Sequence, residues 1–565
     1  MRILLLTHAF NSLTQRLAAE LRQRGHLVSV EFDISDSVTE EAAALFAPDL
    51  IVAPYLRRAI PESVWSRHVC LIVHPGVVGD RGPSALDWAI DAGRRDWGVT
   101  VLQAEAEMDG GPVWASASLA MRPATKASLY RHEVTQAATT AVLQAVECFA
   151  AGNFVPQRPS SSQWQPLMKQ AHRAIDWQQD DSATVLRKID AADGFPGVVD
   201  TLFDQPCHVF DAWPESTLRG APGEVLAQRE TALLRATIDG AVWIGHVKRP
   251  GSIKLPATLA FAEEAAVVPH ALLPDWWRAA APTWQDIAYE ESGGIGFLHF
   301  EFYNGAMSTR QCERLRDALV WAKQRPTRVL VLPGGLDFWS NGIHLNVIEA
   351  ASLSGGSAAD ESWHNINAMN DLALELITTT QQITVAAIGG NAGAGGCFLA
   401  RAADLVWVRD GVMLNPHYKN MGNLYGSEYW TYLLPRRVGQ NAAQAIMHNR
   451  QPLTAHGALQ LGLTDACLSG DVSAFRADVA AMAARLAAAP DLPGQLAAKT
   501  KSRARDEAAK PLAAYRNEEM AHMHRNFYGF DPSYHVARHH FVQKSLASWT
   551  PRHLARHREL GWKLP

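Results

Sequence analysis

Two widely separated sets of loop residues constrain the fold of this chain more than any other feature. The first set comprises residues 74–82 and 108–111, and the second comprises residues 338–344 and 392–399. Both sets contain glycine, which lets a backbone approach a ligand closely. Ligands of open α/β sheets bind beyond the carboxyl ends of strands. The sequence therefore predicts two separate sites, one in each half of the chain.

The chain has 565 residues, and since single domains usually contain about 150 residues, we expect several of them. Hydrophobic residues make up 47% and charged residues 19%, a balance typical of globular proteins. We predict an α/β multidomain protein with a proline- and alanine-rich linker. Its divisions are a first domain at 1–160, a second at 161–253, the linker at 254–284, a third domain at 285–490 and a basic helical segment at 491–565.

Apolar segments alternate with helix-like segments in the first domain. Strands are predicted at residues 3–6, 28–30, 48–53 and 69–73. Leu13, Leu17 and Leu21 recur at helical spacing between the first two strands. This alternation indicates a doubly wound parallel sheet. Residues 7–12 contain no glycine after the first strand, so a dinucleotide site is not expected.

The motifs of this domain resemble the formyltransferase fold of methionyl-tRNA formyltransferases. The matching segments are, in order, residues 48–52, 72–76, 81–85, 98–101 and 108–113. The resemblance implies transfer of the formyl group of 10-formyltetrahydrofolate by an Asn-x-His pair and an Asp. His74 and Asp109 match the His and the Asp, whereas Ile72 stands in the place of the asparagine.

Formyl transfer passes through a tetrahedral oxyanion, which needs a donor near the charge and a base near the nucleophile. His74 can donate or shuttle a proton, and Asp109 can orient it or accept the proton. Ile72 can do neither, and the loss of one oxyanion donor costs on the order of a hundredfold in rate. Two interpretations stay open: a degenerate folate binder, or an acceptor such as a thiol that needs less help. Ile72, Arg81 and Gly82 are the predicted cofactor-binding positions.

The second domain resembles the linker and small β-barrel that follow in those enzymes. The matching segments are residues 173–177 and 189–197, and its strands are predicted at 222–226, 233–238 and 242–247. We expect an OB-like barrel. Acidic residues are interspersed among the basic residues of this domain, so a basic surface that binds nucleic acid is not predicted.

The third domain contains two loops, Phe338–His344 and 390–399, that resemble the hallmark loops of the crotonase (enoyl-CoA hydratase/isomerase) superfamily. The resemblance implies a ββα spiral and a coenzyme A thioester whose oxygen accepts hydrogen bonds from two backbone N–H groups. The positions that match are Asn341 and Gly395, with Gly342 and Gly396 beside them as cofactor-binding residues. The positive end of the helix after the second loop adds to the attraction.

Departures from this superfamily are equally informative. Phe398 and His417 stand where hydratases carry two glutamates, so hydratase activity is not expected. Other acids must then act, and the aromatic stretch after His417 offers them. We predict Glu428 as the base and Tyr429 or Tyr425 as the acid, with His417 as a further catalytic candidate.

Lys and Arg outnumber Asp and Glu in residues 499–565, although the whole chain carries a net charge of -5. One interpretation is a solvated helical surface, and the other is an arm that neutralises cofactor phosphates. The residues of such an arm would be Arg503, Arg505, Arg525, Arg538 and Lys544, among which Arg538 is predicted to bind the cofactor.

The combination of the three domains resembles, end to end, the HypX/HoxX family of hydrogenase maturation proteins. The resemblance implies synthesis of CO for the iron of [NiFe]-hydrogenase, with 10-formyltetrahydrofolate as carbon source, coenzyme A as carrier and formyl-CoA as intermediate. Two alternatives stay open. The chain could be a hydrolase that releases formate, or a noncatalytic scaffold that binds folate or coenzyme A.

The expected partners are small-molecule substrates and the hydrogenase maturation machinery that receives CO. No apolar run approaches the roughly 20 residues that span a bilayer, and residues 1–7 indicate a buried strand instead of a signal sequence. The six cysteines are scattered without a Cys-x-x-Cys pair, so neither a structural zinc site nor a redox dithiol is predicted. We expect a cytoplasmic protein without nucleic-acid or membrane partners.

Overall fold

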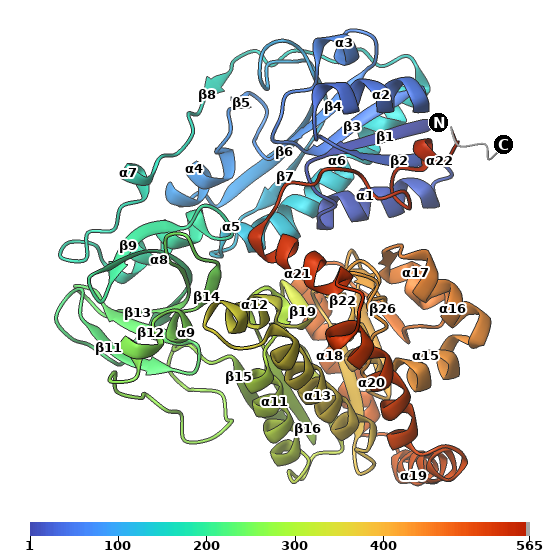
Figure 1. Ribbon diagram of the computed structural model, residues 1–565. Helices are drawn as coiled ribbons and strands as arrows, with labels where there is room; N and C mark the ends of the chain where they lie inside the picture. The colour runs from blue at the N-terminus through green and yellow to red at the C-terminus, as the bar shows by residue number, and fades with distance from the viewer. Residues whose placement is uncertain (561–565) are drawn as a thin grey trace. The chain divides into compact units, whose positions relative to one another are not determined.

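A computed structural model describes residues 1–560 of the chain (Figure 1). The chain forms two compact units. The first contains Met1–Ala271 together with the C-terminal segment from Leu546, and the second contains Leu272–Ser545. The predicted domains 1–160 and 161–253 therefore share one unit, and the predicted segment 491–565 is divided between the two.

The first unit begins with a six-stranded sheet of order β2-β1-β3-β4-β6-β7. Its strands are β1 (Arg2–Thr7), β2 (Leu27–Phe32), β3 (Leu50–Tyr55), β4 (Cys70–His74), β6 (Asp96–Gln103) and β7 (Val113–Ala120). The first four in the order are parallel, as predicted, but β6 runs antiparallel to both β4 and β7. The predicted parallel arrangement of the first four strands is confirmed, and the sequence did not predict the antiparallel strands β6 and β7, whose short connection suits antiparallel neighbours.

Helices cover both faces of this sheet. Ile3 and Leu5 of β1 pack in one apolar cluster with α1 (Ser12–Gln23) and α6 (Thr135–Ala151). Leu4 and Leu6 pack in another with α2 (Asp36–Phe46). Since side chains alternate along a strand, the apolar run of β1 buries both faces. The doubly wound arrangement is confirmed.

The second sheet of this unit is antiparallel, in the order β11-β12-β13-β10-β9 with β14 beside β13. Its strands are β9 (Val198–Leu202), β10 (Gln205–Glu215), β11 (Val225–Arg229), β12 (Ala232–Ala236), β13 (Ala241–Lys248) and β14 (Lys254–Pro256). Helix α8 (Ser182–Ala192) packs on it through Val185 and Ile189. The assignment to the OB class stays a prediction.

The C-terminal segment returns to the edge strand β2. The Val30 N–H donates to the Leu554 carbonyl at 3.0 Å, and the Phe32 N–H donates to Thr550 Oγ1 at 2.9 Å. Helix α22 (Arg556–Leu560) then places His557 beside Glu31. An exposed edge strand is an aggregation risk, and this segment covers it.

The second unit contains two larger sheets and a short pair of strands, β17 (Ala306–Met307) and β20 (Gly342–Ile343). One sheet contains, in spatial order, β15 (Ile287–Ser292), β16 (Ile295–Phe300), β18 (Val329–Leu332), β21 (Ile383–Ile388), β23 (Leu405–Arg409) and β26 (Ala466–Leu468). The other sheet contains, in spatial order, β19 (Phe338–Ser340), β22 (Asn391–Gly393), β24 (Met413–Asn415) and β25 (Leu453–Thr454). The helices include α11 (Thr309–Ala322), α13 (Ala358–Ile377), α19 (Leu492–Ala509), α20 (Leu512–Tyr528) and α21 (Ser533–Gln543).

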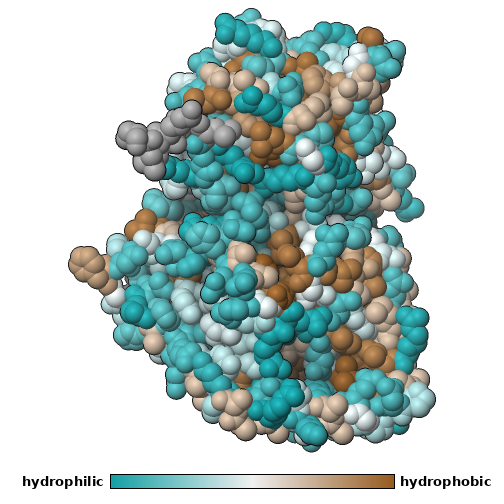
Figure 2. Space-filling model, turned by 90° about the vertical axis from the view of Figure 1, so that its right-hand side faces the viewer, coloured by the Kyte–Doolittle hydropathy of each residue, from teal (hydrophilic) through white to brown (hydrophobic). Residues whose placement is uncertain are grey.

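The surface is mixed in character. Figure 2 shows apolar patches between hydrophilic areas on one face, as on most globular proteins. Within residues 1–560, no helix is both long and apolar enough to span a membrane.

Candidate active sites

His74 ends β4 and lies between two carboxylates. Its Nε2 is 2.7 Å from Asp80 Oδ2, and its Nδ1 is 3.5 Å from Asp109 Oδ2. The side chains of His74 and Asp80 are nearly inaccessible, and that of Asp109 is only 11% exposed. The predicted pair of His74 and Asp109 is therefore brought together, but Asp80 makes the closer contact and was not predicted.

Glycine permits this arrangement. A Cβ on Gly76 would collide with both His74 and Asp80, so the loop after β4 can pass close to their contact only without a side chain. The Asp109 backbone has φ 51°, an uncommon conformation for a residue other than glycine. Its carboxylate accepts a hydrogen bond from the Gly82 N–H at 3.0 Å. Gly82 thus positions Asp109 in this structure.

Ile72 lies two residues before His74 in β4 and therefore on the same face of the strand. Its partly buried side chain packs against the apolar cluster of β1 and α2. Arg81 binds the neighbouring loop: Nε donates to the Met108 carbonyl at 3.0 Å, and Nη1 pairs with Glu107 at 2.7 Å. The contact of Ile72 and Arg81 with a cofactor stays a prediction.

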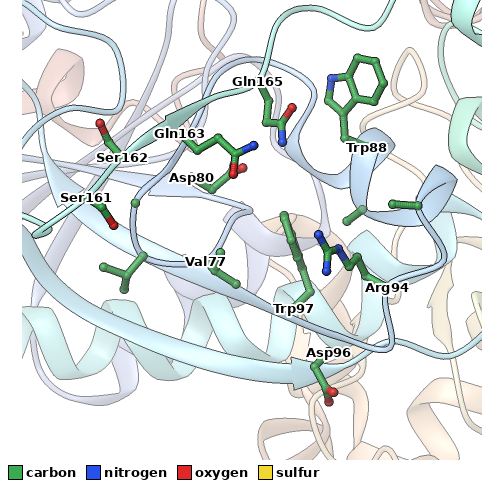
Figure 3. A pocket seen from close by; sticks show the side chains of 14 residues that line it. Val77, Asp80, Trp88, Arg94, Asp96, Trp97, Ser161, Ser162, Gln163 and Gln165 are labelled. Carbon is green, nitrogen blue, oxygen red and sulfur yellow. The ribbon is translucent and has the colours of Figure 1, made fainter.

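A cavity of about 670 Å³ adjoins this site (Figure 3). Asp80 lies on its wall beside Gln163 of β8 (Gln163–Trp164), the strand that pairs with β5 (Asp80–Arg81). Trp88, Trp97, small apolar side chains and further polar side chains complete the lining. Asp80 therefore faces His74 and also borders this cavity.

The second site lies where two loops of the second unit approach each other. Strands β19 and β22 pair in parallel and lead into these loops. A Cβ on Gly342 would stand 3.3 Å from the Gly395 nitrogen, at the first residue of α14 (Gly395–Arg401). The first N–H groups of a helix have no intrahelical acceptor, so those of Gly395 and Gly396 can serve a ligand oxygen.

The prediction for Asn341 needs correction. Its backbone N–H donates to the Gly305 carbonyl at 2.7 Å, and its side-chain amide donates to the Asn304 carbonyl at 2.8 Å. The N–H that we expected at a thioester oxygen is therefore already bonded. The Gly342 N–H contacts Ser340 Oγ at 3.1 Å.

Glu428 lies against the loop of Gly395. A Cβ on Gly395 would collide with the Glu428 carboxyl group, so that group occupies the space directly beside this glycine. The residue is 1% exposed. Burial raises the pKa of Glu428 to about 8, and the negative charge of Glu519 acts in the same direction. A carboxyl group of this kind can exchange protons near neutral pH.

Tyr418 is the partner of Glu428. Its phenol oxygen is 2.5 Å from Glu428 Oε2 and 3.0 Å from the Ser427 carbonyl. The ring stacks on Phe398, with centroids 5.4 Å apart, and burial holds the pKa of Tyr418 well above its usual range. Phe398, which replaces a hydratase glutamate, thus supports this tyrosine. The aromatic stretch of the sequence contained Tyr418 but did not single it out.

The two tyrosines that we predicted as acids lie elsewhere. Tyr425 stacks on His522 of α20, with centroids 3.9 Å apart. Tyr429 is buried, and a hydrogen bond with Arg516 lowers its pKa against the larger raising effect of burial. Tyr418 is the tyrosine whose side chain donates a hydrogen bond to Glu428, and the acid roles of Tyr425 and Tyr429 stay predictions. His417 is buried, and its catalytic role stays a prediction.

The backbone at Glu428 is strained, and hydrogen bonds from other elements stabilise it. Glu428 and Tyr429 have φ 58° and 60°, which for residues other than glycine costs free energy. The Glu428 N–H donates to Asn370 Oδ1 at 2.8 Å. Glu519 of α20 accepts the N–H groups of Tyr429 and Thr431 at the start of α15 (Trp430–Val438). These bonds offset the strain, and burial raises the pKa of Glu519 to about 7.

Arg538 is not a free cation in this structure. Its Nε donates to Glu349 at 2.8 Å, and both side chains are nearly inaccessible. The guanidinium thus neutralises a buried carboxylate, and the predicted binding of cofactor phosphates by Arg538 stays untested.

The fold and the two sites define a protein that joins a formyltransferase-type half to a crotonase-type half. Three families match it: Formyl transferase over residues 1–146, Formyl transferase, C-terminal domain, over residues 167–264, and Enoyl-CoA hydratase/isomerase over residues 297–551. The hydrogenase maturation factor HoxX of Bradyrhizobium diazoefficiens is 54% identical over 99% of this chain and 97% of its own length. The chain belongs to the HoxX/HypX family of hydrogenase maturation factors.

Two further relatives cover different parts of the molecule. HypX from Aquifex aeolicus, solved in complex with tetrahydrofolic acid, is 47% identical, covers 100% of both chains and has a TM-score of 0.97. The methionyl-tRNA formyltransferase of Aromatoleum aromaticum is 28% identical over 41% of this chain and 75% of its own. The similarity to HypX from Aquifex aeolicus covers both halves of the chain.

Proposed function

We propose that the chain makes CO for the iron of [NiFe]-hydrogenase in two steps. The first step transfers the formyl group of 10-formyltetrahydrofolate to coenzyme A, and the second decarbonylates formyl-CoA to CO and coenzyme A. Membership of a family of hydrogenase maturation factors supports the proposal that the CO serves hydrogenase maturation. The folate complex of HypX from Aquifex aeolicus supports the carbon source.

In the first step, the coenzyme A sulfur attacks the formyl carbon, a C–S bond forms and the bond to N10 of the folate breaks. The thiol proton ends on N10 of tetrahydrofolate. Asp80 holds the Nε2 edge of His74, so the Nδ1 edge beside Asp109 is the one that handles this proton. A thiol ionises more readily than an amine is deprotonated, so this acceptor suits a site with Ile72 in place of an amide donor.

In the second step, Glu428 removes the proton of the formyl carbon while the formyl oxygen accepts hydrogen bonds at the start of α14. The C–H electron pair becomes part of CO, and the C–S pair leaves with the sulfur. The thiolate then takes the proton back from Glu428. Only a formyl thioester can react in this way, because its acyl carbon carries hydrogen. The pKa of about 8 suits a group that accepts and returns a proton.

One observation carries the second step: the buried Glu428 carboxyl group lies against Gly395, beside the N–H groups at the start of α14. An acyl oxygen bound there would bring its carbon within reach of a carboxylate. Phe398 and His417 replace the carboxylates that water addition requires, which favours decarbonylation over hydration.

The test uses purified full-length protein and 10-formyltetrahydrofolate labelled at the formyl carbon, with and without coenzyme A. Reduced haemoglobin traps CO, and formate is assayed in parallel. Labelled CO that requires both protein and coenzyme A is the expected result. Formate without CO would establish the hydrolase instead, and folate binding without either product would establish the scaffold.

A further inference from the structure

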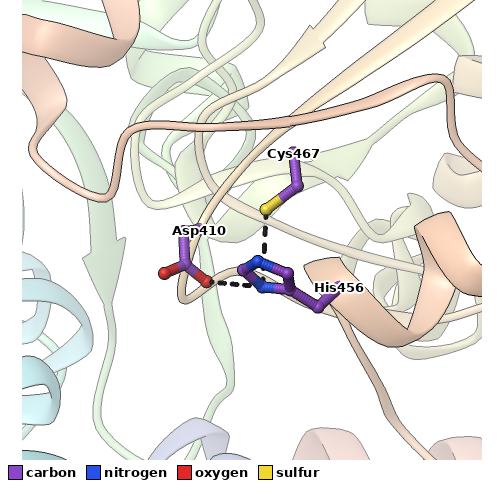
Figure 4. Close-up of side chains that lie close together, drawn as sticks. All are labelled: Asp410, His456 and Cys467. Atoms are coloured by element: carbon purple, nitrogen blue, oxygen red, sulfur yellow. Dashed lines mark hydrogen bonds and ion pairs between the residues drawn. The ribbon is translucent and has the colours of Figure 1, made fainter.

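A cluster of three side chains in the second unit lies outside the site of Glu428. Asp410 directly follows β23, Cys467 lies in the adjacent strand β26, and His456 lies in the first turn of α17 (Ala455–Gln460). The three side chains point toward one another (Figure 4). Their ligand atoms all lie within 4.8 Å of each other.

The distances fit a tetrahedral metal centre. His456 Nδ1 is 3.3 Å from Asp410 Oδ1 and 3.6 Å from Cys467 Sγ. Zinc bonds of about 2.0–2.3 Å at tetrahedral angles separate neighbouring ligand atoms by about 3.4–3.6 Å. Small side-chain rotations would bring the carboxylate and sulfur to the same separation.

Hydrogen bonds among the three side chains satisfy this cluster poorly. Both contacts of His456 use Nδ1, which carries either one proton or one lone pair. A protonated Nδ1 must share its hydrogen between a carboxylate and a sulfur. An unprotonated Nδ1 can accept from the Cys467 thiol, but its lone pair then faces the Asp410 carboxylate. A cation between the three groups satisfies all of them.

We propose that Asp410, His456 and Cys467 bind one divalent transition-metal ion of the zinc class, with a fourth position open to water. Thiolate and imidazole ligands favour zinc, cobalt and nickel ions over magnesium and calcium. Binding replaces the thiol proton of Cys467 with the metal and releases that proton to solvent. The bound ion fastens the start of α17 to the ends of β23 and β26.

The scaffold suits such a role. β23 and β26 pair in parallel, with Val408 opposite Cys467, and the Asp410 N–H donates to the Leu468 carbonyl at 2.9 Å. The Asp410 carboxylate also accepts the Gly411 N–H at 2.8 Å, which orients it. Cys467 thus lies in β26 and Asp410 directly after the neighbouring strand β23, so the sheet determines the spacing of two of the three ligands.

The test titrates cobalt(II) into the full-length protein after chelator treatment. We expect one equivalent to produce a thiolate-to-cobalt charge-transfer band together with the visible bands of tetrahedral cobalt. Cys467→Ser should abolish the charge-transfer band, and His456→Gln should weaken binding about tenfold or more, at least the loss that outer-shell partners cause. His456 is 64% exposed, so its replacement leaves the core intact.

Cys148→Ser is the matched control, because Cys148 is a partly buried free cysteine of α6 in the other unit. This variant should bind cobalt as the unchanged chain does. Zinc should also raise the melting temperature of the unchanged chain and of Cys148→Ser, but not of Cys467→Ser. Absence of the charge-transfer band, or its persistence in Cys467→Ser, would overturn the proposal.

Discussion

The Tyr418 phenol donates a 2.5 Å hydrogen bond to the Glu428 carboxylate, which is buried directly beside Gly395. Burial alone makes the charged form of Glu428 unfavourable, and the bond from Tyr418 lowers its pKa toward the neutral range. Glu428 is therefore a carboxyl group that can accept a proton, and Tyr418 is the neighbour that lowers its pKa.

Replacement of this carboxyl group should stop CO formation. Glu428→Gln keeps the size of the side chain but cannot accept a proton, and we expect CO production to fall about a hundredfold or more. Labelled formyl-CoA should accumulate, because the first site is unchanged. Glu518→Gln is the control, since Glu518 is an exposed neighbour of Glu519 on α20 that pairs with Lys510. Undiminished CO from Glu428→Gln would remove Glu428 as the base.

Tyr418→Phe should move the pH profile of the decarbonylation step. The reaction requires ionised Glu428, so its rate should rise with pH and level off above about pH 8. Loss of the phenol hydrogen bond raises the pKa of Glu428 further, so the rise should shift to higher pH. The stacking on Phe398 is retained. CO formation from supplied formyl-CoA, measured between pH 6 and 10, checks this, and an unshifted profile would contradict it. Tyr528→Phe, at an exposed tyrosine of α20, is the control.

Local motifs made much of the molecule predictable. His74 and Asp109 belong to short runs whose order marks the fold, and Gly395 and Gly342 were recognisable because close backbone approach demands glycine. The alternation of the first four strands with helix-like segments likewise predicted the doubly wound sheet. These features depend on neighbours in sequence.

Other contacts depend on the path of the chain and were missed. The loop after β4 turns back so that Asp80 contacts His74, and the loop after β24 brings Tyr418 to Glu428. The N–H of Asn341 is bonded to the carbonyl of Gly305, from another part of the chain. The candidate metal ligands come from two strand ends and a helix, so no short motif joins them.

The raised pKa of Glu428 predicts a pH-dependent stability. Its pKa is about 8 in the folded chain and near 4.5 when unfolded, so the folded state binds more protons between these values. The contribution of this group to stability is greatest below about pH 4.5, falls by roughly 1.4 kcal/mol per pH unit as pH rises, and is lost once pH exceeds about 8. In calorimetry at pH 6 and 8.5, Glu428→Gln should reduce the fall in melting temperature. An equal fall in melting temperature in both proteins would contradict the conclusion that ionisation of buried Glu428 destabilises the folded chain.

Asp80 should act as a positioning residue for His74. Asp80→Asn keeps an oxygen near Nε2 but removes the charge, and we expect the kcat of formyl-CoA formation to fall on the order of 100-fold. The KM for 10-formyltetrahydrofolate should change little. Asp96→Asn is the matched control, because Asp96 lines the same cavity and is exposed. A change in KM alone would assign Asp80 to binding instead.

The buried pair of Glu31 and His557 should stabilise the first unit. His557 Nε2 is 2.8 Å from Glu31 Oε2, and both side chains are fully inaccessible. Arg558 adds a second contact to the same oxygen, and these partners lower the pKa of Glu31 against its burial. His557→Ala removes one partner of a buried carboxylate and leaves a cavity, so we expect a loss of about 2–4 kcal/mol. Thermal unfolding of the full-length protein measures this loss. His540→Ala, at an exposed histidine of α21, should be neutral. If both variants melt at the same temperature as the unchanged chain, the C-terminal segment does not stabilise β2.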